Sequence, residues 1–119
     1  MSLYRTMLFT PANDLRKVGK ALMLNADGVV LDLEDAVAFS EKARARLALK
    51  EALALPRACD VFIRVNSAQS DFILADLLAS VTEGVKGIVL AKSESAEEIR
   101  QVDWVIGQLE KERGLPAGS

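Results

Sequence analysis

Apolar and polar positions follow one another along the chain in a regular order, with four short apolar runs each followed by a longer amphipathic segment. The apolar runs predict strands over residues 4–9, 28–33, 60–65 and 87–91. The segments between them predict helices over residues 14–24, 41–53 and 71–81, and a fourth that follows Ser95 and ends at Gly114. The pattern therefore indicates an α/β protein built from four successive strand-helix units.

Capping residues and apolar stripes support these helices. Asn13, Ser40 and Ser95 are expected to be N-caps, and Ser95-Ala-Glu-Glu98 is a capping-box pattern. Pro56 is expected to stop the second helix, and Gly84 to mark the exit from the third. The apolar positions that share a face in each helix are Leu15, Val18 and Leu22; Leu49 and Leu53; Leu74, Leu78 and Val81; and Ile99, Val102, Ile106 and Leu109.

Right-handed crossovers wind such units in one direction, so the four strands are expected to form a parallel sheet. Two closures remain open from the pattern alone, a doubly wound sheet and a (β/α)8 barrel. A complete barrel needs about 250 residues, roughly twice the length of this chain. The first and fourth strands would then be edges that another segment must cover. We expect a single domain over residues 1–119.

Three carboxylates, those of Asp32, Glu34 and Asp35, follow directly on the second apolar run. A buried parallel strand has no use for carboxylates, whereas ligands of parallel α/β folds sit beyond the carboxyl ends of the strands. The alternative is that these acids only cap or turn the chain, since Asp is favoured in turns. Three acids within four residues favour the functional interpretation.

Each of the other strands also ends in polar residues, and the carboxyl ends of parallel strands share one rim. Arg64 is the best single candidate there, because a guanidinium offers two parallel donors to a carboxylate substrate. Its structural alternative is an internal salt bridge to Asp32 or Glu34, and both roles can hold together. Lys92 is as easily a solvated residue at a helix entrance. The polar residues of this rim, other than the three acids, are Thr10, Asn13, Arg64, Asn66, Lys92, Ser93 and Glu94.

The remaining charged and reactive residues have simpler interpretations. The charge runs at 42–46 and 110–113 are most simply solvated helix faces. Cys59 and Trp104 are expected to be packing residues.

Composition excludes several classes of function. The chain carries 15 basic and 17 acidic residues, a formal charge of -2, without a basic run or aromatic series, so no nucleic-acid partner is expected. A single cysteine allows no internal disulfide, and no membrane segment is visible, which fits a reducing cytoplasm. The sequence has no histidine, which excludes a Ser-His-Asp triad and a zinc site built on imidazole. Any catalysis is therefore expected to use carboxylates, Arg, Lys or a metal. The metal that suits carboxylate and water ligands is magnesium or manganese.

Five stretches together resemble the N-terminal half of the citrate lyase β-subunit family, which includes malyl-CoA lyases and belongs with the HpcH/HpaI aldolase superfamily. The longest and most specific of them is the Asp-Gly-Val-Val-Leu-Asp-Leu-Glu-Asp-Ala-Val stretch. One departure is Ala91, where the family usually has Pro. The five stretches are Arg5-Thr-Met-Leu-Phe-Thr-Pro-Ala-Asn13, Ala26-Asp-Gly-Val-Val-Leu-Asp-Leu-Glu-Asp-Ala-Val37, Lys42-Ala-Arg44, Ile63-Arg-Val-Asn66 and Gly87-Ile-Val-Leu-Ala-Lys92.

The resemblance implies the first four units of a (β/α)8 barrel of the TIM-barrel type, usually oligomeric. The whole enzyme would cleave or form a carbon-carbon bond in a 3-hydroxy acyl thioester, with magnesium holding the α-keto acid. By resemblance Arg64 binds the keto acid, and Glu34 and Asp35, with Asp32 as a further candidate, contact metal-bound waters. Arg5 resembles residues that meet the CoA or acyl-carrier thioester, a weaker match, and Asn66 and Lys92 complete the expected substrate-binding set.

The relatives' two direct metal ligands, a Glu and an Asp after strands five and six, would lie beyond Ser119. The sequence therefore predicts a half-barrel that is inactive on its own and that associates with itself or with the missing half. The competing class is a non-catalytic interaction module that uses its exposed strands to complete a barrel. A third hypothesis, a novel site in a symmetric dimer, would not place acids where strands five and six normally do. The sequence leaves the acyl thioester open between citryl, malyl and related groups.

Overall fold

The structure is a computed structural model that describes residues 5–24, 26–116 and 118. Strands and helices alternate along it, with one short 3-10 helix before the second α-helix. The elements are β1 (Met7–Pro11), α1 (Leu15–Leu22), β2 (Gly28–Asp32), η1 (Phe39–Glu41), α2 (Lys42–Leu53), β3 (Asp60–Val65), α3 (Ile73–Ser80), β4 (Gly87–Leu90) and α4 (Ala96–Glu112). The four predicted strand-helix units are confirmed. Tyr4, where the first strand was expected to begin, lies outside the described residues.

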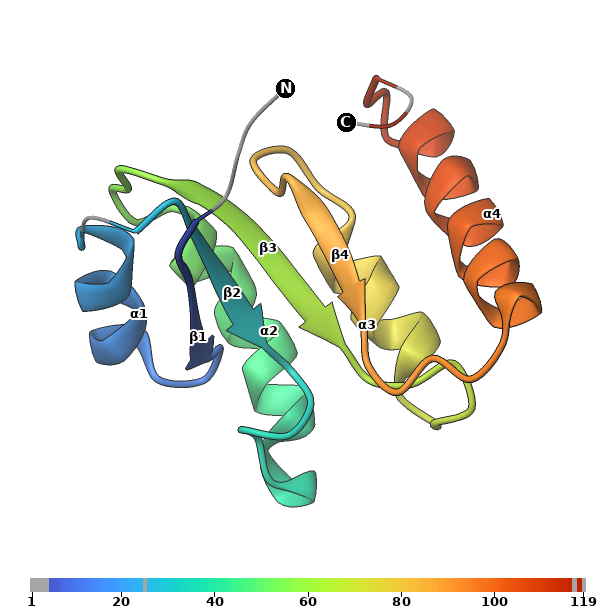
Figure 1. The fold of residues 1–119 in the computed structure, drawn as a ribbon, viewed down its shortest axis with the longest axis horizontal. Coiled ribbons are helices and arrows are strands. Elements are labelled where there is room, and N and C mark those ends of the chain that lie inside the picture. The colour runs from blue at the N-terminus through green and yellow to red at the C-terminus, as the bar shows by residue number, and fades with distance from the viewer. Residues whose placement is uncertain (1–4, 25, 117, 119) are drawn as a thin grey trace.

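The strands form one parallel sheet in the order β1-β2-β3-β4, so every crossover joins neighbouring strands. Their carboxyl ends point the same way, toward the lower edge of Figure 1. The register aligns Pro11, Asp32, Arg64 and Val89 across the four strands. This row lies at or just before the carboxyl ends, and it places the polar residues of the second and third strands side by side.

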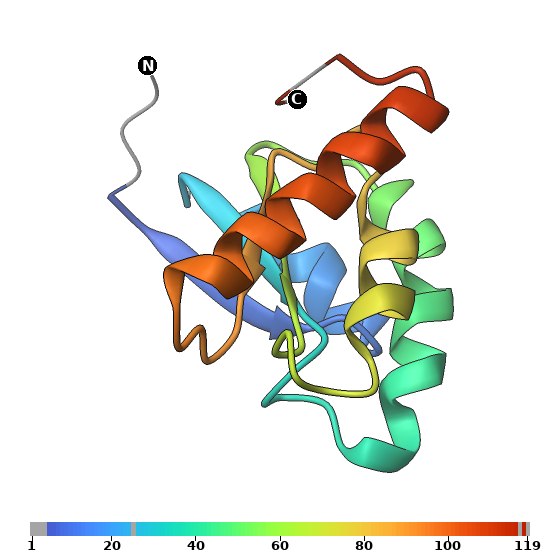
Figure 2. The ribbon, with the colours of Figure 1, turned by 90° about the vertical axis from the view of Figure 1, so that its right-hand side faces the viewer.

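The hydrophobic core lies between the sheet and the helices α1, α2 and α3. Burial alternates strictly along β3, where Val61, Ile63 and Val65 are buried and the residues between them are half-buried. The buried apolar strand residues that point to this side of the sheet pack in one cluster with Leu22, Leu49 and Leu77. Figure 1 and Figure 2 show α2 and α3 on one face of the sheet and α4 beyond its β4 edge.

The opposite face of the sheet is uncovered by helices in both views. It carries Phe9, Val30 and Phe62 in one row of the register, and Phe9 is 54% exposed. Gly28 makes room for Met7 and for the Phe62 ring, because a Cβ there would lie 2.7 Å from the sulfur of Met7 and 3.2 Å from that ring. The strands β1 and β4 are the two edges of the sheet.

The helix ends differ from prediction at two of the three N-termini. Asp14, not Asn13, caps α1 by accepting the amide N–H of Lys17, at 3.1 Å. Ser40 is no N-cap, since it lies within η1 and α2 begins only at Lys42. The Ser95 cap is confirmed by the hydrogen bond from the Glu98 amide, at 3.2 Å. Asn and Asp both suit this role, so the sequence does not distinguish Asn13 from its neighbour Asp14.

The apolar face proposed for the third helix is wrong at Leu74 and Leu78 and confirmed at Val81, which is 6% exposed. Leu74 and Leu78 are 58% and 46% exposed, while Leu77 and Asp76 are buried. The helix is turned because the Asp76 carboxylate must reach its partners, and a buried carboxylate without hydrogen bonds would be too costly. The apolar stripe predicted for α4 is confirmed at Val102 and Leu109, and it is wrong at Ile99 in the first turn, which is exposed. Trp104 was expected to be a packing residue, and this prediction is wrong because its side chain is 66% exposed.

The interpretation of both charge runs as solvated faces is also partly wrong. Lys42 is buried and Arg46 pairs with Asp76 in the first run, although Arg44 is 74% exposed as expected. In the second run Glu110 is buried, and the Arg113 guanidinium donates to the carbonyl of Val81. Each buried charge lies where α2 or α4 contacts the rest of the fold, a position that a run of charges does not reveal.

Candidate functional site

Asp32 ends β2 with both carboxylate oxygens fully engaged. Oδ1 accepts the amide of Glu34 at 2.8 Å, and Oδ2 accepts the amide of Ala36 at 3.0 Å. Each oxygen also accepts one N–H of Arg64. Burial alone would raise the pKa of Asp32, but the hydrogen bonds from Arg64 and from the two amides outweigh it and lower that pKa. The carboxylate therefore serves as an internal anchor and has no oxygen lone pair to spare for metal-bound water.

Arg64 projects from β3 onto the uncovered face and is about one quarter exposed. Its Nε lies 2.9 Å from Oδ1 of Asp32 and its Nη2 lies 2.6 Å from Oδ2, a two-pronged pair. The guanidinium also lies over the ring of Phe9, 4.9 Å from its centroid. The hydrogen bonds to Asp32 raise the pKa of Arg64, so the group stays cationic. The internal salt bridge proposed for Arg64 is thus confirmed.

The pair with Asp32 uses only one edge of the guanidinium. Nη1 has no hydrogen-bond partner among the residues that the structure describes, and Nη2 keeps its second N–H. Those two nitrogens form the second two-donor edge of the fork, suited to a carboxylate. Glu34 lies nearby, 3.8 Å from Nε. The structure therefore leaves room for the substrate role of Arg64 beside its structural one.

Lys92 joins the carboxyl end of β4 to the acidic loop after β2. Its ammonium forms a short contact with Glu34 and lies 3.1 Å from Oδ1 of Asp35. These hydrogen bonds raise the pKa of Lys92, and the one from Lys92 lowers the pKa of Asp35. Lys92 has a left-handed backbone, with φ 49°, a conformation that tends to occur at functional positions in non-glycine residues.

Asn66, one residue past β3, is held from behind. Its amide N–H and its side-chain Nδ2 both donate to Oδ2 of Asp76, at 2.9 and 2.6 Å. Nδ2 also donates to the carbonyl of Leu33, at 3.0 Å, and Arg46 of α2 donates to Asp76 at 3.3 Å. Sequence reasoning found Asn66 and missed Asp76, although a lone acid in the apolar α3 segment was a signal for it.

Glu34, Asp35, Asn66 and Lys92 border an open groove of about 350 Å³ at the carboxyl edge of the sheet, whereas Asp32 and Arg64 are not among the residues that line it. The Phe39 and Phe72 rings form one side of it, in an edge-to-face contact with centroids 5.3 Å apart. The groove is lined by Glu34, Asp35, Val37, Ala38, Phe39, Lys42, Asn66, Ser67, Ser70, Phe72 and Lys92.

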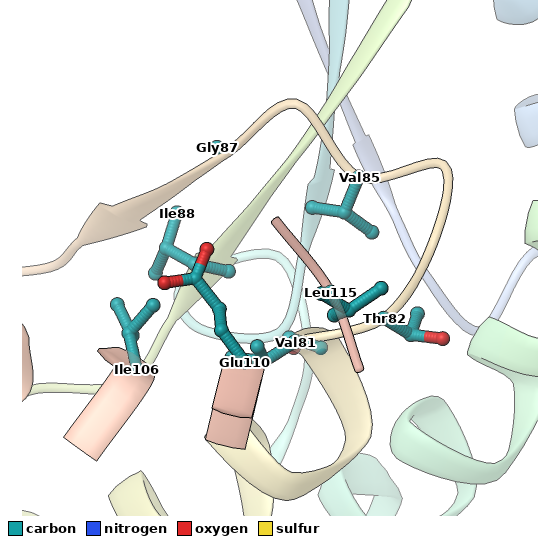
Figure 3. A pocket seen from close by; sticks show the side chains of 9 residues that line it. Val81, Thr82, Val85, Gly87, Ile88, Ile106, Glu110 and Leu115 are labelled. Atoms are coloured by element: carbon teal, nitrogen blue, oxygen red, sulfur yellow. The ribbon is translucent and has the colours of Figure 1, made fainter. Parts of the chain in front are cut away.

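A second cavity, beside the amino end of β4, is too small for a substrate. Figure 3 shows it between Gly87 and Ile88 of β4, Val81 after α3 and Ile106 of α4. Its volume of about 30 Å³ is room for a single water. The buried hydroxyl of Ser80 also lines this cavity and has no hydrogen-bond partner within the residues that the structure describes. A water in the cavity would provide one.

The structure does not bring the first strand's candidates into the cluster. Arg5 lies before β1, at the amino edge of the sheet and across the strand's length from the groove, and its backbone N–H donates to Asp27 at 2.5 Å. Thr10 is buried, and its hydroxyl has no hydrogen-bond partner among the described residues. Asn13, Ser93 and Glu94 also line none of this groove.

The acidic residues fit a metal ion only through water. No group of three His, Cys, Asp or Glu side chains within residues 5–24, 26–116 and 118 is arranged to hold a metal. Glu34 and Asp35 already converge on one cation, the ammonium of Lys92. Two carboxylates at one point suit the outer shell of a hydrated hard cation, while Asp32 is excluded from that role by its four hydrogen bonds.

Four parallel strands in sequence order, each followed by a helix, with a charged cluster at their carboxyl edge, define part of a (β/α)8 barrel. The chain belongs to the HpcH/HpaI aldolase/citrate lyase family, whose model matches residues 5–119. The resemblance inferred from the sequence is therefore confirmed, and so is the barrel class. No helix of the described residues is long and apolar enough to cross a membrane.

Two similar proteins show what the family contains. Citrate lyase subunit beta of Haemophilus influenzae is 38% identical over 121 residues, which span all of this chain and 42% of that protein. A (3S)-malyl-CoA thioesterase of Cereibacter sphaeroides is 33% identical over 108 residues, 89% of this chain and 38% of that protein. The family thus includes both a lyase subunit and a thioesterase, and this chain spans about two fifths of the length of either relative.

Solved structures agree. The Mycobacterium tuberculosis citrate lyase beta subunit with oxaloacetate and magnesium matches with a TM-score of 0.66 and 32% identity, over 81% of this chain and 42% of that one. The CitE protein of the same organism with magnesium, acetoacetate and coenzyme A matches with a TM-score of 0.68 and 32% identity, over 84% and 38%. Both structures contain magnesium and a keto acid.

Proposed function

We propose that this chain supplies the keto-acid-binding part of a magnesium-dependent carbon-carbon lyase of the citrate lyase β type. As part of a longer chain it would cleave a 3-hydroxy acyl thioester, of the citryl-CoA or malyl-CoA kind, into an α-keto acid and an acyl thioester. The observation that carries this proposal is Arg64, pinned by Asp32 on one edge and open on the other, at the carboxyl edge of the sheet. The oxaloacetate and acetoacetate of the solved relatives support it.

The rim residues have distinct roles in this proposal. The free edge of Arg64 binds the carboxylate of the keto acid, beside Glu34. Asn66 and Lys92 line the groove that Glu34 also lines, as further substrate contacts. Glu34 and Asp35 accept hydrogen bonds from metal-bound waters and orient them. Bound magnesium, or manganese in its place, would supply Lewis acidity to the oxygen that becomes the keto carbonyl.

Cleavage itself makes demands that these residues meet only in part. The hydroxyl proton must leave, the hydroxyl carbon becomes the keto carbon, and the electron pair of the broken bond passes to the carbon beside the thioester, which then takes up a proton. A cationic Arg64 stabilises the keto-acid end throughout this change. The CoA or acyl-carrier thioester is assigned to Arg5 only by resemblance, and the position of Arg5 at the amino edge of the sheet lends that assignment no support.

The experiment that tests this function is an assay with the longest polypeptide of the source organism that carries residues 1–119. Its intact mass and light-scattering mass are measured first, on one sample. We expect magnesium-dependent release of a keto acid from citryl-CoA or malyl-CoA, abolished by EDTA and restored by magnesium. Thioester hydrolysis without carbon-carbon cleavage would instead place the protein with the thioesterase of the family. No turnover by a chain longer than 119 residues would refute the lyase.

The open edges of the sheet favour one alternative, a non-catalytic half-barrel that pairs with itself or with a second polypeptide. Both β1 and β4 lack a neighbour on one side among the described residues, and the uncovered face carries the exposed ring of Phe9. Unpaired strand edges promote association. A 119-residue protein that light scattering shows to be a dimer, without turnover, would support this module. A monomer at the same concentration would contradict self-pairing.

A further inference from the structure

Lys42 is a buried cation that has no acidic partner in the part of the chain that the structure describes. Its side chain is 5% exposed, and no carboxylate within the described residues lies within salt-bridge distance of its ammonium. The ammonium instead donates to the carbonyls of Leu33, Glu34 and Val37, at 3.1, 3.0 and 3.2 Å. It also lies 5.7 and 5.5 Å from the ring centroids of Phe39 and Phe72. Three donors thus meet three acceptors.

The three carbonyls all belong to the acidic loop. They bracket Glu34 and Asp35, the two residues whose carboxylates face the groove. Glu34 is held on both sides of its backbone, because its amide donates to Asp32 while its carbonyl accepts from Lys42. Val37 closes the turn through its own N–H to the carbonyl of Glu34, at 3.1 Å.

We propose that Lys42 is a positioning residue that shapes the acidic loop around its ammonium and so aims Glu34 and Asp35 into the groove. The side chain lines the groove, but the three carbonyls take all three N–H donors of its ammonium, so none is left for a substrate. The buried ammonium of Lys42 needs hydrogen bonds to these carbonyls. Because all three carbonyls must point at one ammonium, the backbone between Leu33 and Val37 has to turn around it. The consequence for activity rests on the function proposed above, whereas the consequence for the loop does not.

Amide hydrogen exchange in the 119-residue chain tests the loop directly. Lys42→Met keeps the length and removes the charge, and Lys50→Met, at an exposed lysine of the same helix, is the matched control. We expect the amides of Glu34 and Ala36 to exchange about tenfold faster or more in Lys42→Met, since hydrogen bonds to charged groups are lost. The core amides of β3 should keep their protection, and Lys50→Met should change neither set. Unchanged loop protection in a folded Lys42→Met protein would overturn the proposal.

A second measurement needs no variant, in case Lys42→Met fails to fold. Nuclear magnetic resonance of the unsubstituted protein should show slow solvent exchange of the Lys42 ammonium and couplings from its nitrogen to the carbonyl carbons of Leu33, Glu34 and Val37. Exchange as fast as that of Lys50, with no such coupling, would overturn the proposal. In the longer polypeptide we expect Lys42→Met to weaken magnesium activation about tenfold with little change in keto-acid affinity. If the activity of the unsubstituted longer polypeptide does not depend on magnesium, the proposed function is wrong. The conclusion from hydrogen exchange, that Lys42 shapes the acidic loop, is unaffected by that outcome.

Discussion

Arg64 and Asp32 are direct cross-strand neighbours in β3 and β2, and the guanidinium grips the carboxylate through two N–H groups at 2.9 and 2.6 Å. The pair leaves a buried anion neutralised and a cation with one edge open. It sits where the acidic loop leaves the sheet, because the same carboxylate accepts the amides of Glu34 and Ala36. One ion pair thus anchors the acidic loop through Asp32 and carries the proposed substrate contact through Arg64.

Arg64→Lys should weaken keto-acid binding about tenfold or more, because a single ammonium cannot hold Asp32 and a substrate carboxylate in the same two-pronged way. Calorimetric titration of the longest available polypeptide with oxaloacetate or glyoxylate measures the effect. Arg100→Lys, at an exposed arginine of α4, is the control and should bind normally. Equal affinity in both variants would remove Arg64 from the substrate site.

The pH dependence of stability should reveal Asp32. Its pKa in the folded protein lies below its ordinary value of 3.8, so its contribution is present above that value and is lost as the pH falls through the folded pKa. Asp32→Asn should cost about 3 kcal/mol near pH 6, since Arg64 loses its counter-charge. The difference from the unsubstituted protein should shrink below pH 4. Urea unfolding between pH 6 and 2.5 measures it, with Asp71→Asn as an exposed control. A pH-independent difference would contradict this role.

Glu34→Gln should weaken magnesium dependence roughly tenfold, as outer-shell partners of metal sites commonly do. The neutral amide would accept hydrogen bonds from metal-bound water less strongly and would release the ammonium of Lys92. A magnesium titration of activity in the longer polypeptide reads this out, and Glu51→Gln, at an exposed position of α2, should leave the titration unchanged. An identical magnesium curve for Glu34→Gln would end its proposed role.

Asp76→Ala should destabilise the fold by about 3 kcal/mol or more, because the donors of Asn66 and the charge of Arg46 would be left buried or half-buried without an anion. Thermal or urea unfolding of the 119-residue chain measures the loss. Asp103→Ala, at an exposed acid of α4, should change stability little. If the two variants prove equally stable, Asp76 does not support the rim.

The sequence predicted the parts of the fold that depend on periodicity. Residues 60–65 are bounded as expected, because β-branched and aromatic residues fill β3 and turn residues flank it. The ion pair of Arg64 with Asp32 was also foreseeable, since a charged residue inside a strand needs a partner. The rotation of α3 about its axis could not be predicted from the sequence, because its three leucines are compatible with more than one buried face. The hydrogen-bond partners of Asp76 determine which face is buried.

Lys42 was the larger omission. In the sequence it opens a run of charges on a helix, which is usually a solvated face. Its burial depends on η1 and the acidic loop folding back over the start of α2, a tertiary arrangement with no periodic signal. The clue was positional: a lysine eight residues after Glu34 could reach a loop that must turn back on itself.

The carbonyl of Leu33 accepts from both Lys42 and Asn66, at 3.1 and 3.0 Å. A carbonyl oxygen has two lone pairs, so this one peptide group is saturated. Through this shared acceptor, the loop after β2 is connected to the residue that follows β3. If Glu34 and Asp35 move toward a bound cation, β3, which carries Arg64, must therefore move with them, or a buried hydrogen bond must break.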